Sequence, residues 1–384
     1  MQTNKIESIE GIRGVACLMV FLSHLSSTFL PSMHTGNIAN AKTPIDIFMI
    51  NSPFAFIYSG VAAVGIFFVL SGFILSYGVL NKGEVISKAA GMAVKRYFRL
   101  MPPALLSCVI AFFIFSFIDV DKTSLGDWAK NYNISSPDFF ESIWTGSVTP
   151  FFIGSAPYNW SLWTMKIEFF GSMALFFLCC VVSQVRYKKM VVLITMLIPF
   201  FMNIKAGDDI YYAAFFSGML IYLLNIRFNL FLGMIIFIIG LFLCGYHSNG
   251  LWYKWINELV NLSVYGRKID NYTLFNNIGG FLVVLSIVKT DFLSRILSAK
   301  ILFKMGALSF SVYVLHQPIM HVTTPVIFNL SINNNISYGA SSAIASVLTL
   351  IIVYLISIPY HKYIDNFSVK FSNKIKSIVM EKRA

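Results

Sequence analysis

The chain has 384 residues, of which 57% are hydrophobic and only 12% are charged. Soluble domains average about 25% charged residues, so this composition excludes an ordinary soluble domain and indicates an integral membrane protein. The net charge of +12 then reports on the orientation of the chain in the membrane, and no nucleic-acid partner is expected.

Ten apolar stretches predict an all-α integral membrane protein with about ten transmembrane helices. A helix needs roughly 20 apolar residues to cross a hydrocarbon core about 30 Å thick. No stretch indicates a separate soluble domain, so residues 1–365 are expected to form one transmembrane domain, followed by a basic tail over residues 366–384. The predicted spans lie at roughly 13–31, 56–80, 103–118, 161–183, 190–204, 209–225, 229–246, 272–288, 306–328 and 340–360.

Lysine and arginine are distributed unevenly between the predicted loops. If the N-terminus lies in the cytoplasm, 21 of the 29 Lys and Arg residues fall in cytoplasmic segments. Because positive residues favour that side, both termini are expected to be cytoplasmic. Residues 119–160 then form a long acidic and aromatic loop on the outer face, and the basic tail is expected to lie against anionic lipid.

The first predicted span carries two residues that are costly in a membrane. Arg13 opens it, and His24 lies inside it eleven residues further on. This spacing is about three helical turns, so both side chains lie on nearly the same face, roughly 16 Å apart along the axis. Such a histidine is expected to face the protein interior and to serve a function. The alternative is structural: Arg13 extends to the interface and His24 bonds a neighbouring carbonyl.

Two groups of residues predict packing rather than chemistry. The second span has no charged residue but contains Gly60, Gly65 and Gly72, and small residues let helices approach closely. The five cysteines all fall in apolar runs without metal-ligand spacing, so neither a disulfide framework nor a metal site is predicted.

Arg96 and Arg99 precede the third span at its expected cytoplasmic mouth. They are three residues apart, which places them on one face of a helix. A guanidinium offers bidentate donors to a phosphate, so the pair indicates a phosphate-bearing ligand. The alternative is an anchor that only follows the positive-inside rule.

Glu168 lies some two turns inside the fourth span, behind the motif Trp160-Ser161-Leu162-Trp163. A carboxylate in an apolar run needs a partner. Lys166 is poorly placed, because residues two apart on a helix do not face each other. A His or Arg from another helix is therefore expected beside Glu168, either in an active site or in a purely structural ion pair.

The ninth span contains His316, in the motif Leu315-His316-Gln317-Pro318, and His321 five residues later. Pro318 is expected to break the helix nearby, because proline lacks a backbone N–H. For both histidines a structural role remains an alternative to a functional one.

Five motifs, in this order, closely resemble the membrane-bound acyltransferase-3 family of integral-membrane, mostly bacterial O-acyltransferases. The resemblance runs from about residue 6 to 365. Glu10 stands where the family usually has Asp, and Gly65 stands where it often has an acidic residue. The motifs are Glu10-Gly-Ile-Arg13-Gly with His24, Gly65-Ile-Phe-Phe-Val-Leu-Ser-Gly-Phe73, Arg96-x-x-Arg99-Leu-x-Pro102, Ser161-Leu-Trp163-x-x-x-x-Glu168 and Leu315-His316-Gln-Pro318.

The resemblance implies a role for each motif. The donor substrate is expected to be acyl-CoA, most often acetyl-CoA, with no permanently bound cofactor and no metal. His24 is the implied catalytic base, and Glu168 is favoured over Glu10 as the carboxylate that orients it. The implied catalytic residues are His24, Glu168 and Arg13; the residues implied to bind the CoA phosphates are Arg96, Arg99 and Arg13; those implied to bind the acceptor are Glu10, Ser161, Trp163 and His316.

The expected function is O-acyl transfer to a sugar hydroxyl of a cell-surface polysaccharide, at the bacterial inner membrane. A lipid-linked O-antigen intermediate is the favoured acceptor; exopolysaccharide, peptidoglycan and small lipophilic molecules are alternatives. Direct transfer and an acyl-histidine intermediate both remain open. Intramembrane Arg, His and Glu would also suit a proton-coupled transporter or a lipid-linked sugar flippase, and many spans with a large outer loop would suit a glycan polymerase. None of these rivals should consume acyl-CoA.

Overall fold

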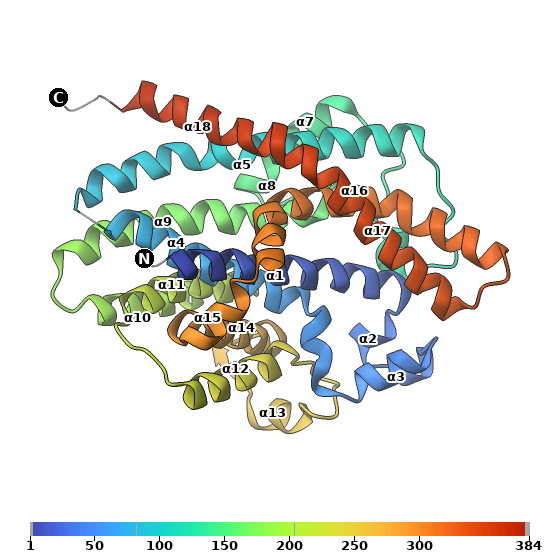
Figure 1. Cartoon of the computed structure of the whole chain (residues 1–384), viewed down its shortest axis with the longest axis horizontal. Helices are drawn as coiled ribbons and strands as arrows, with labels where there is room; N and C mark the ends of the chain where they lie inside the picture. The colour runs from blue at the N-terminus through green and yellow to red at the C-terminus, as the bar shows by residue number, and fades with distance from the viewer. Residues whose placement is uncertain (1–2, 82, 203, 381–384) are drawn as a thin grey trace. The chain divides into compact units, whose positions relative to one another are not determined.

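The computed structural model describes residues 3–81, 83–202 and 204–380, and these are almost entirely helical (Figure 1). In these residues the only strands are β1 (Ser263–Val264) and β2 (Arg267–Lys268), which pair antiparallel with Ser263 opposite Lys268. Tyr265 and Gly266 connect them with φ angles of 49° and 75°, a turn whose twist suits two antiparallel strands. Apart from this hairpin the fold is all-α, as predicted.

Two compact units make up the chain. Unit 1 consists of Met1–Val20, Asn51–Val94 and Ile167–Ala307, and unit 2 of Phe21–Ile50, Lys95–Lys166 and Leu308–Ala384. The helices wholly or mainly in unit 1 are α1 (Thr3–Phe29), η2 (Pro53–Tyr58), α4 (Gly60–Leu80), α9 (Thr164–Gln184), α10 (Lys188–Phe201), α11 (Asp208–Leu223), α12 (Leu230–Cys244), α13 (Lys254–Leu259), α14 (Asn271–Lys289) and α15 (Asp291–Leu297).

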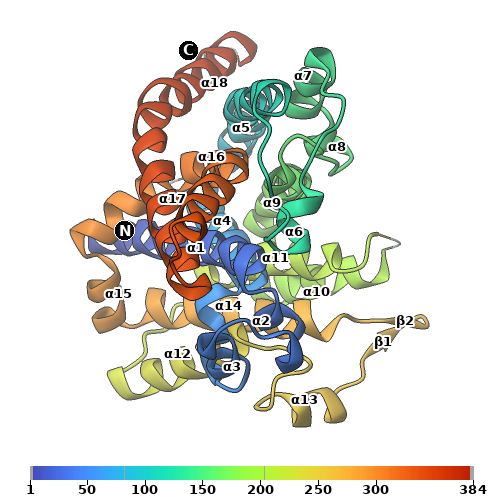
Figure 2. The ribbon, with the colours of Figure 1, turned by 90° about the vertical axis from the view of Figure 1, so that its right-hand side faces the viewer.

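The helices of unit 2 include most of the chain's short helices and the C-terminal ones, which Figure 2 shows from a second side. They are α2 (Ser32–Thr35), η1 (Ile38–Asn40), α3 (Pro44–Ile50), α5 (Val85–Phe117), α6 (Asp127–Asn131), α7 (Phe139–Ser147), α8 (Thr149–Phe152), η3 (Trp160–Trp163), α16 (Lys300–Asn333), α17 (Tyr338–Tyr360), the π-helix η4 (His361–Asp365) and α18 (Asn366–Val379).

All ten predicted spans overlap a helix, but they differ in length. Within the described residues, six helical segments are long and apolar enough to cross a membrane, and there is a seventh if α15 and α16, bent by 70°, form one span. The three predicted spans at 190–204, 209–225 and 229–246 are α10, α11 and α12, with 14, 16 and 15 residues. At 1.5 Å per residue these helices are only about 21–24 Å long. The structure therefore supports a multi-pass membrane protein, and the predicted number of ten spans is not confirmed.

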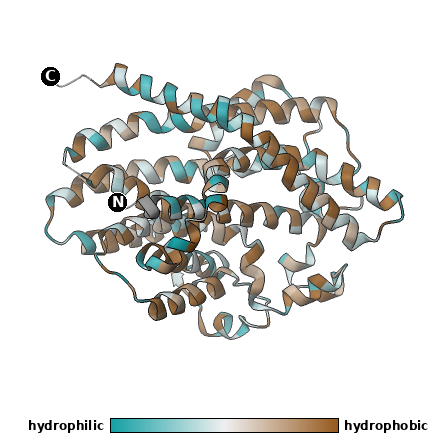
Figure 3. Ribbon diagram, in the orientation of Figure 1, coloured by the Kyte–Doolittle hydropathy of each residue, from teal (hydrophilic) through white to brown (hydrophobic). Residues whose placement is uncertain are grey.

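The outer faces of several helices are apolar, as lipid contact requires. Figure 3 shows α12 as an almost wholly hydrophobic helix, and its exposed side chains include Phe231 and Ile238. Helix α18 instead alternates hydrophilic and hydrophobic residues, with Phe367 and Ile378 among its exposed ones. An amphipathic helix of this kind suits a membrane surface rather than a span.

Two helices continue through prolines, and at one of them the sequence predicted an interruption. Helix α5 starts at Val85 and passes Pro102 and Pro103, so it begins well before the predicted span at 103–118. Helix α16 passes Pro318, so the predicted break there is wrong. The missing N–H of Pro318 frees the carbonyl of Val314, and the Asn159 side chain donates to this oxygen at 2.7 Å. A membrane helix tolerates proline when a neighbour satisfies the freed carbonyl in this way.

Glycines allow backbone contact between α4 and α11 in unit 1. A Cβ at Gly72 would collide with the carbonyl oxygen of Phe215, and one at Gly218 with the carbonyl oxygen of Val69. A Cβ at Gly65 would lie 2.5 Å from Asn277 Oδ1 on α14. The prediction that Gly65 and Gly72 serve close packing is confirmed.

Candidate active site

Two histidines that are 292 residues apart in the chain meet in unit 2. His24 Nδ1, on the last two turns of α1, lies 2.8 Å from His316 Nε2 on α16. Their rings are nearly parallel, with centroids 5.0 Å apart. His316 is buried, and the indole of Trp128, on α6, stacks on the other histidine with its centroid 4.6 Å away. The structure thus brings the predicted base, His24, into contact with His316, for which the sequence had left a structural role open.

Backbone carbonyls determine which ring nitrogens of this pair carry protons. His316 Nδ1 lies 2.7 Å from the carbonyl oxygen of Tyr313 and 3.2 Å from that of Val312. A carbonyl can only accept, so His316 Nδ1 carries the proton, and in the neutral ring His316 Nε2 is the acceptor. His24 Nδ1 must then be the donor, which leaves the lone pair on His24 Nε2. Among the described residues nothing hydrogen-bonds His24 Nε2.

A buried network of polar groups fixes His316 in place. Ser161 Oγ lies 3.4 Å from His316 Nε2 and donates to Gln317 Oε1 at 3.0 Å, and the Ser161 N–H donates to the same oxygen at 2.7 Å. The Tyr313 hydroxyl donates to the Ser161 carbonyl at 2.8 Å and lies 2.9 Å from Thr164 Oγ1. Asn159 Nδ2 donates to Ser107 Oγ at 3.0 Å. The η3 segment therefore holds the part of α16 that carries His316, and the predicted acceptor-binding residue Ser161 lies beside the histidine pair.

Three predicted site residues have contacts within unit 1. Ser71 Oγ donates to the Glu168 carboxylate at 3.1 and 3.3 Å. Arg13 Nη1 donates to both carboxylate oxygens of Glu10, at 3.1 and 3.3 Å. The sequence favoured a carboxylate as the group that orients His24; at Nδ1 of this ring the structure has an imidazole instead. Catalytic or substrate-binding roles for Glu168, Arg13 and Glu10 stay predictions.

The predicted phosphate-binding residue Arg99 is already held by the C-terminal helices. Its Nη1 lies 2.6 Å from Asp365 Oδ1 and donates to Ser368 Oγ at 2.7 Å. Phe310 lies 5.5 Å from the guanidinium, and His361 lies 3.0 Å from the other oxygen of Asp365. The ion pair and the hydrogen bond both use Nη1, so the Nε and Nη2 edge of Arg99 has no hydrogen bond to the part of the chain that the structure describes.

Arg96 and Trp163 are half-buried, on α5 and at the end of η3. Arg96 and Arg99 lie three residues apart in one continuous helix, so the prediction that they share one helical face is confirmed. Whether Arg96 binds a phosphate and Trp163 an acceptor stays a prediction.

Sequence reasoning missed three residues of this site. Asn159 satisfies the carbonyl that Pro318 frees, Gln317 bonds Ser161, and Trp128 packs on His24. The proline was a usable signal, since its freed carbonyl requires a donor from another segment. Trp128 gave no such signal, because a tryptophan in a loop next to a membrane usually belongs to the interfacial aromatic belt.

Comparison with known families gives one match. A family model described as an acyltransferase domain matches residues 6–358, nearly the whole chain. Searches among curated proteins and among solved structures gave no match.

Proposed function

Because the chain belongs to the membrane-bound acyltransferase-3 family, a family of membrane acyltransferases, we propose that His24 is the base of an O-acyl transfer from acyl-CoA to a hydroxyl of a cell-surface glycan. The observation that carries the proposal is the hydrogen bond from His24 Nδ1 to His316 Nε2. It holds the His24 ring in the tautomer that has its lone pair on Nε2. A general base must have that lone pair before the reaction starts.

The proposed reaction has one proton cycle. The acceptor hydroxyl donates its proton to His24 Nε2 while its oxygen attacks the thioester carbonyl carbon, which gives a tetrahedral intermediate. When this intermediate collapses, the carbon–sulfur bond breaks and the imidazolium returns the proton to the leaving sulfur. The products are the O-acyl ester and free CoA thiol, and the base is neutral again. His316 accepts from Nδ1 throughout and keeps the ring oriented.

Arg96, Arg99 and Arg13 are the proposed contacts of the CoA phosphates. Asp365 and Ser368 hold Arg99 through Nη1, and the free edge with Nε and Nη2 is the one that binds a phosphate in bidentate fashion. Acetyl-CoA is the proposed donor. This role requires α5 to begin on the cytoplasmic side, as the positive residues before residue 102 favour.

The proposed acceptor is a sugar of an O-antigen intermediate, presented at the outer face of the bacterial inner membrane. Both termini are then cytoplasmic, and the loop over residues 119–160 lies on the acceptor side. Trp128, from this loop, packs against the proposed base, which supports entry of the acceptor from that side.

The test is mass spectrometry of surface polysaccharide from cells that carry the intact protein or the His24→Ala variant. We expect an acyl group on the glycan that is lost in His24→Ala while the protein stays in the membrane. His247→Phe is the control, because the His247 ring packs between the rings of Tyr58 and Tyr272 in unit 1 and has no proposed role in the reaction. Acylation that persists in His24→Ala would show that His24 is not the base.

A further inference from the structure

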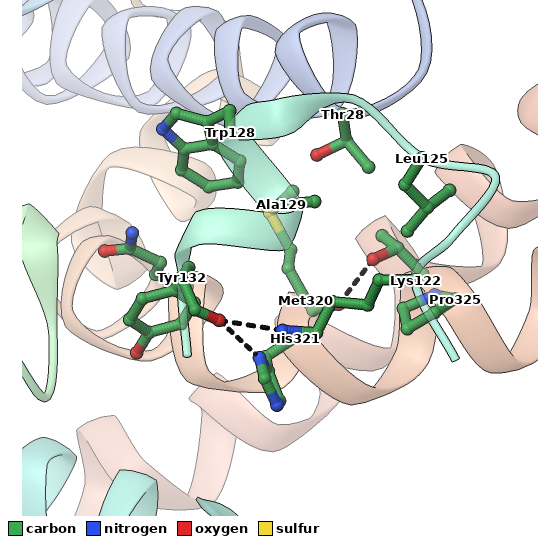
Figure 4. A pocket seen from close by; sticks show the side chains of 11 residues that line it. Thr28, Lys122, Leu125, Trp128, Ala129, Tyr132, Met320, His321 and Pro325 are labelled. Atoms are coloured by element: carbon green, nitrogen blue, oxygen red, sulfur yellow. Dashed lines mark hydrogen bonds between the residues drawn. The ribbon is translucent and has the colours of Figure 1, made fainter. Parts of the chain in front are cut away.

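A small cavity lies in unit 2 beside the histidine pair. Its walls come from the loop that contains α6, from α16 and from the end of α1 (Figure 4). Its volume of about 10 Å³ is room for one water-sized group. Trp128, which stacks on His24, is one of its walls, and so is Gln317, the residue after His316. The polar residues that line it are Thr28, Lys122, Gln317, His321 and Thr324.

Hydrogen bonds to the backbone use up only some of these polar groups. Lys122 Nζ donates to the carbonyl oxygen of Tyr132 at 2.8 Å, and His321 Nδ1 lies 3.1 Å from the same oxygen (Figure 4). The hydroxyls of Thr28 and Thr324 donate to the carbonyls of His24 and Met320. An ammonium has three N–H groups. Lys122 therefore keeps donor capacity after its bond to Tyr132.

The Gln317 side chain lines this cavity, and its amide has an unused donor. Its Oε1 accepts two hydrogen bonds from Ser161, but its Nε2 has no partner among the described residues, and the side chain is fully buried. A buried donor without a partner is destabilising, because it has lost its hydrogen bond to water. Buried polar groups in native proteins are nearly always satisfied, if not by protein then by water or ligand. The described walls include no carboxylate that could take this bond.

We propose that the cavity binds a second oxygen of the acceptor, next to the hydroxyl that is acylated, through Gln317 Nε2 and Lys122 Nζ. This inference rests on the proposed O-acyl transfer. Thr28 follows His24 by about one helical turn, and Gln317 directly follows His316, so the cavity adjoins the reacting hydroxyl. Donors without an acidic neighbour in the wall select an oxygen that accepts hydrogen bonds. The acceptor class is therefore a polyol, such as a sugar with vicinal oxygens, rather than a simple alcohol.

Two probe acceptors of equal ring size distinguish these classes. Vicinal cyclohexanediol has the second oxygen and cyclohexanol lacks it. The assay is release of CoA thiol from acetyl-CoA by the full chain in lipid nanodiscs, with each probe and with water alone. For the wild type we expect kcat/KM to be about tenfold higher for the diol, which corresponds to about 1.4 kcal/mol for the additional hydrogen bond to a charged donor.

Variants of the two donors test the assignment. Lys122→Met should raise KM for the diol about tenfold and leave the KM for acetyl-CoA within about twofold. Gln317→Glu, which keeps an oxygen for Ser161 but removes the donor, should also abolish the preference for the diol. Lys130→Met is the matched control: Lys130 lies in the same loop, is exposed, and has Asp127 4.0 Å away. We expect this control to behave as wild type.

Each other outcome overturns the inference. Equal use of both probes by the wild type would mean that the cavity holds only water. A fall in kcat with both probes in Gln317→Glu, without a change in KM, would assign the cavity to the thioester oxygen instead. Unchanged kinetics in Lys122→Met would remove the lysine from the site. If the wild type releases no more thiol than His24→Ala with either probe or with water, the proposed O-acyl transfer itself fails, and the acceptor site with it.

Discussion

Two helix junctions are formed by different kinds of contact. One joins α4 to α11 in unit 1, and the other joins the last turns of α1 to η3 and α16 in unit 2. At the first, Gly72 and Gly218 bring one backbone against carbonyl oxygens of the other. At the second, side chains of His24, Ser161 and His316 make the contact. Both lie in apolar helices, so the difference does not follow from the surroundings.

This difference separates residues that fold the protein from residues that we propose to act in the reaction. Close packing through glycine needs no polar group and adds no cost of desolvation. Buried imidazoles, hydroxyls and amides are expensive in such a protein, and a packed apolar junction would be as stable without them. Their presence at the second junction is therefore best explained by a reaction. Four experiments follow, and the largest effect is expected at the histidine pair.

Replacement of His316 by Phe should abolish most activity without loss of folded protein. Phe fills the space but cannot accept the hydrogen bond of His24 Nδ1, so the base loses its preferred tautomer and orientation. Loss of a positioned base costs about 10²–10⁴ in rate. His316→Gln, whose amide oxygen can accept the same bond, should retain part of the activity. Thiol release from acetyl-CoA per folded molecule measures both, and equal activity of the two variants would contradict the tautomer argument.

At the glycine junction we expect the opposite outcome, a change in stability rather than in catalysis. Gly218→Ala places a methyl group against the carbonyl of Val69, and such overpacking costs about 1–3 kcal/mol. Thermal unfolding in detergent measures the loss, while activity per folded molecule should stay within about twofold. Gly78→Ala on α4 is the control, because its nearest contact is the flexible end of Met92 at 3.3 Å. Normal stability of Gly218→Ala would remove the contrast between the junctions.

The helical elements were predictable because periodicity and hydropathy are local properties of a chain. The same local signals pointed to His24 and His316 as unusual residues within spans. They could not pair the two, because a sequence separation of 292 residues carries no signal in a single chain. The lengths of some helices were not predicted correctly either. Hydropathy indicated spans at α10, α11 and α12, although each helix has fewer than 18 residues.

Arg99 shows a second limit of reasoning from sequence. Its charge and its spacing from Arg96 suggested a free phosphate-binding pair, yet a carboxylate 266 residues later occupies its Nη1. Asp365 is the last residue of the predicted transmembrane domain, next to the basic tail, and nothing in the sequence pairs it with Arg99. The ion pair depends on how η4 and α18 return along α5, which is a tertiary property. Figure 1 shows α18 beside α5, and Lys95 with Asn373 and Phe98 with Phe371 continue the contact.

The variant Asp365→Asn tests whether this ion pair serves donor binding. Without the carboxylate Arg99 loses its fixed orientation. We expect KM for acetyl-CoA to rise about three- to tenfold, because a misoriented guanidinium loses only part of the roughly 1.5–3 kcal/mol that a charge-assisted bond to phosphate contributes. KM for cyclohexanediol should not change. Asp291→Asn is the matched control, because its pair with Arg227 is exposed and such pairs contribute little. An unchanged donor KM in Asp365→Asn would make Arg99 an anchor for α18 only.

The smallest effect is expected from pH, and it sharpens the role of Lys122. Burial lowers the pKa of Lys122 to about 8, and the negative charge of Asp119 opposes this shift. Two other groups face Lys122. They are the carbonyl oxygen of Tyr132, to which Nζ donates, and the ring of His321, whose Nδ1 contacts the same oxygen. The ammonium is therefore present below about pH 8 and is lost as the pH rises through that value. About half of the ammonium remains at pH 8, so KM for cyclohexanediol should rise about twofold between pH 7 and pH 8. Lys122→Arg keeps its charge over this range and should show a flat profile, whereas a parallel rise in both proteins would assign the titration to another group.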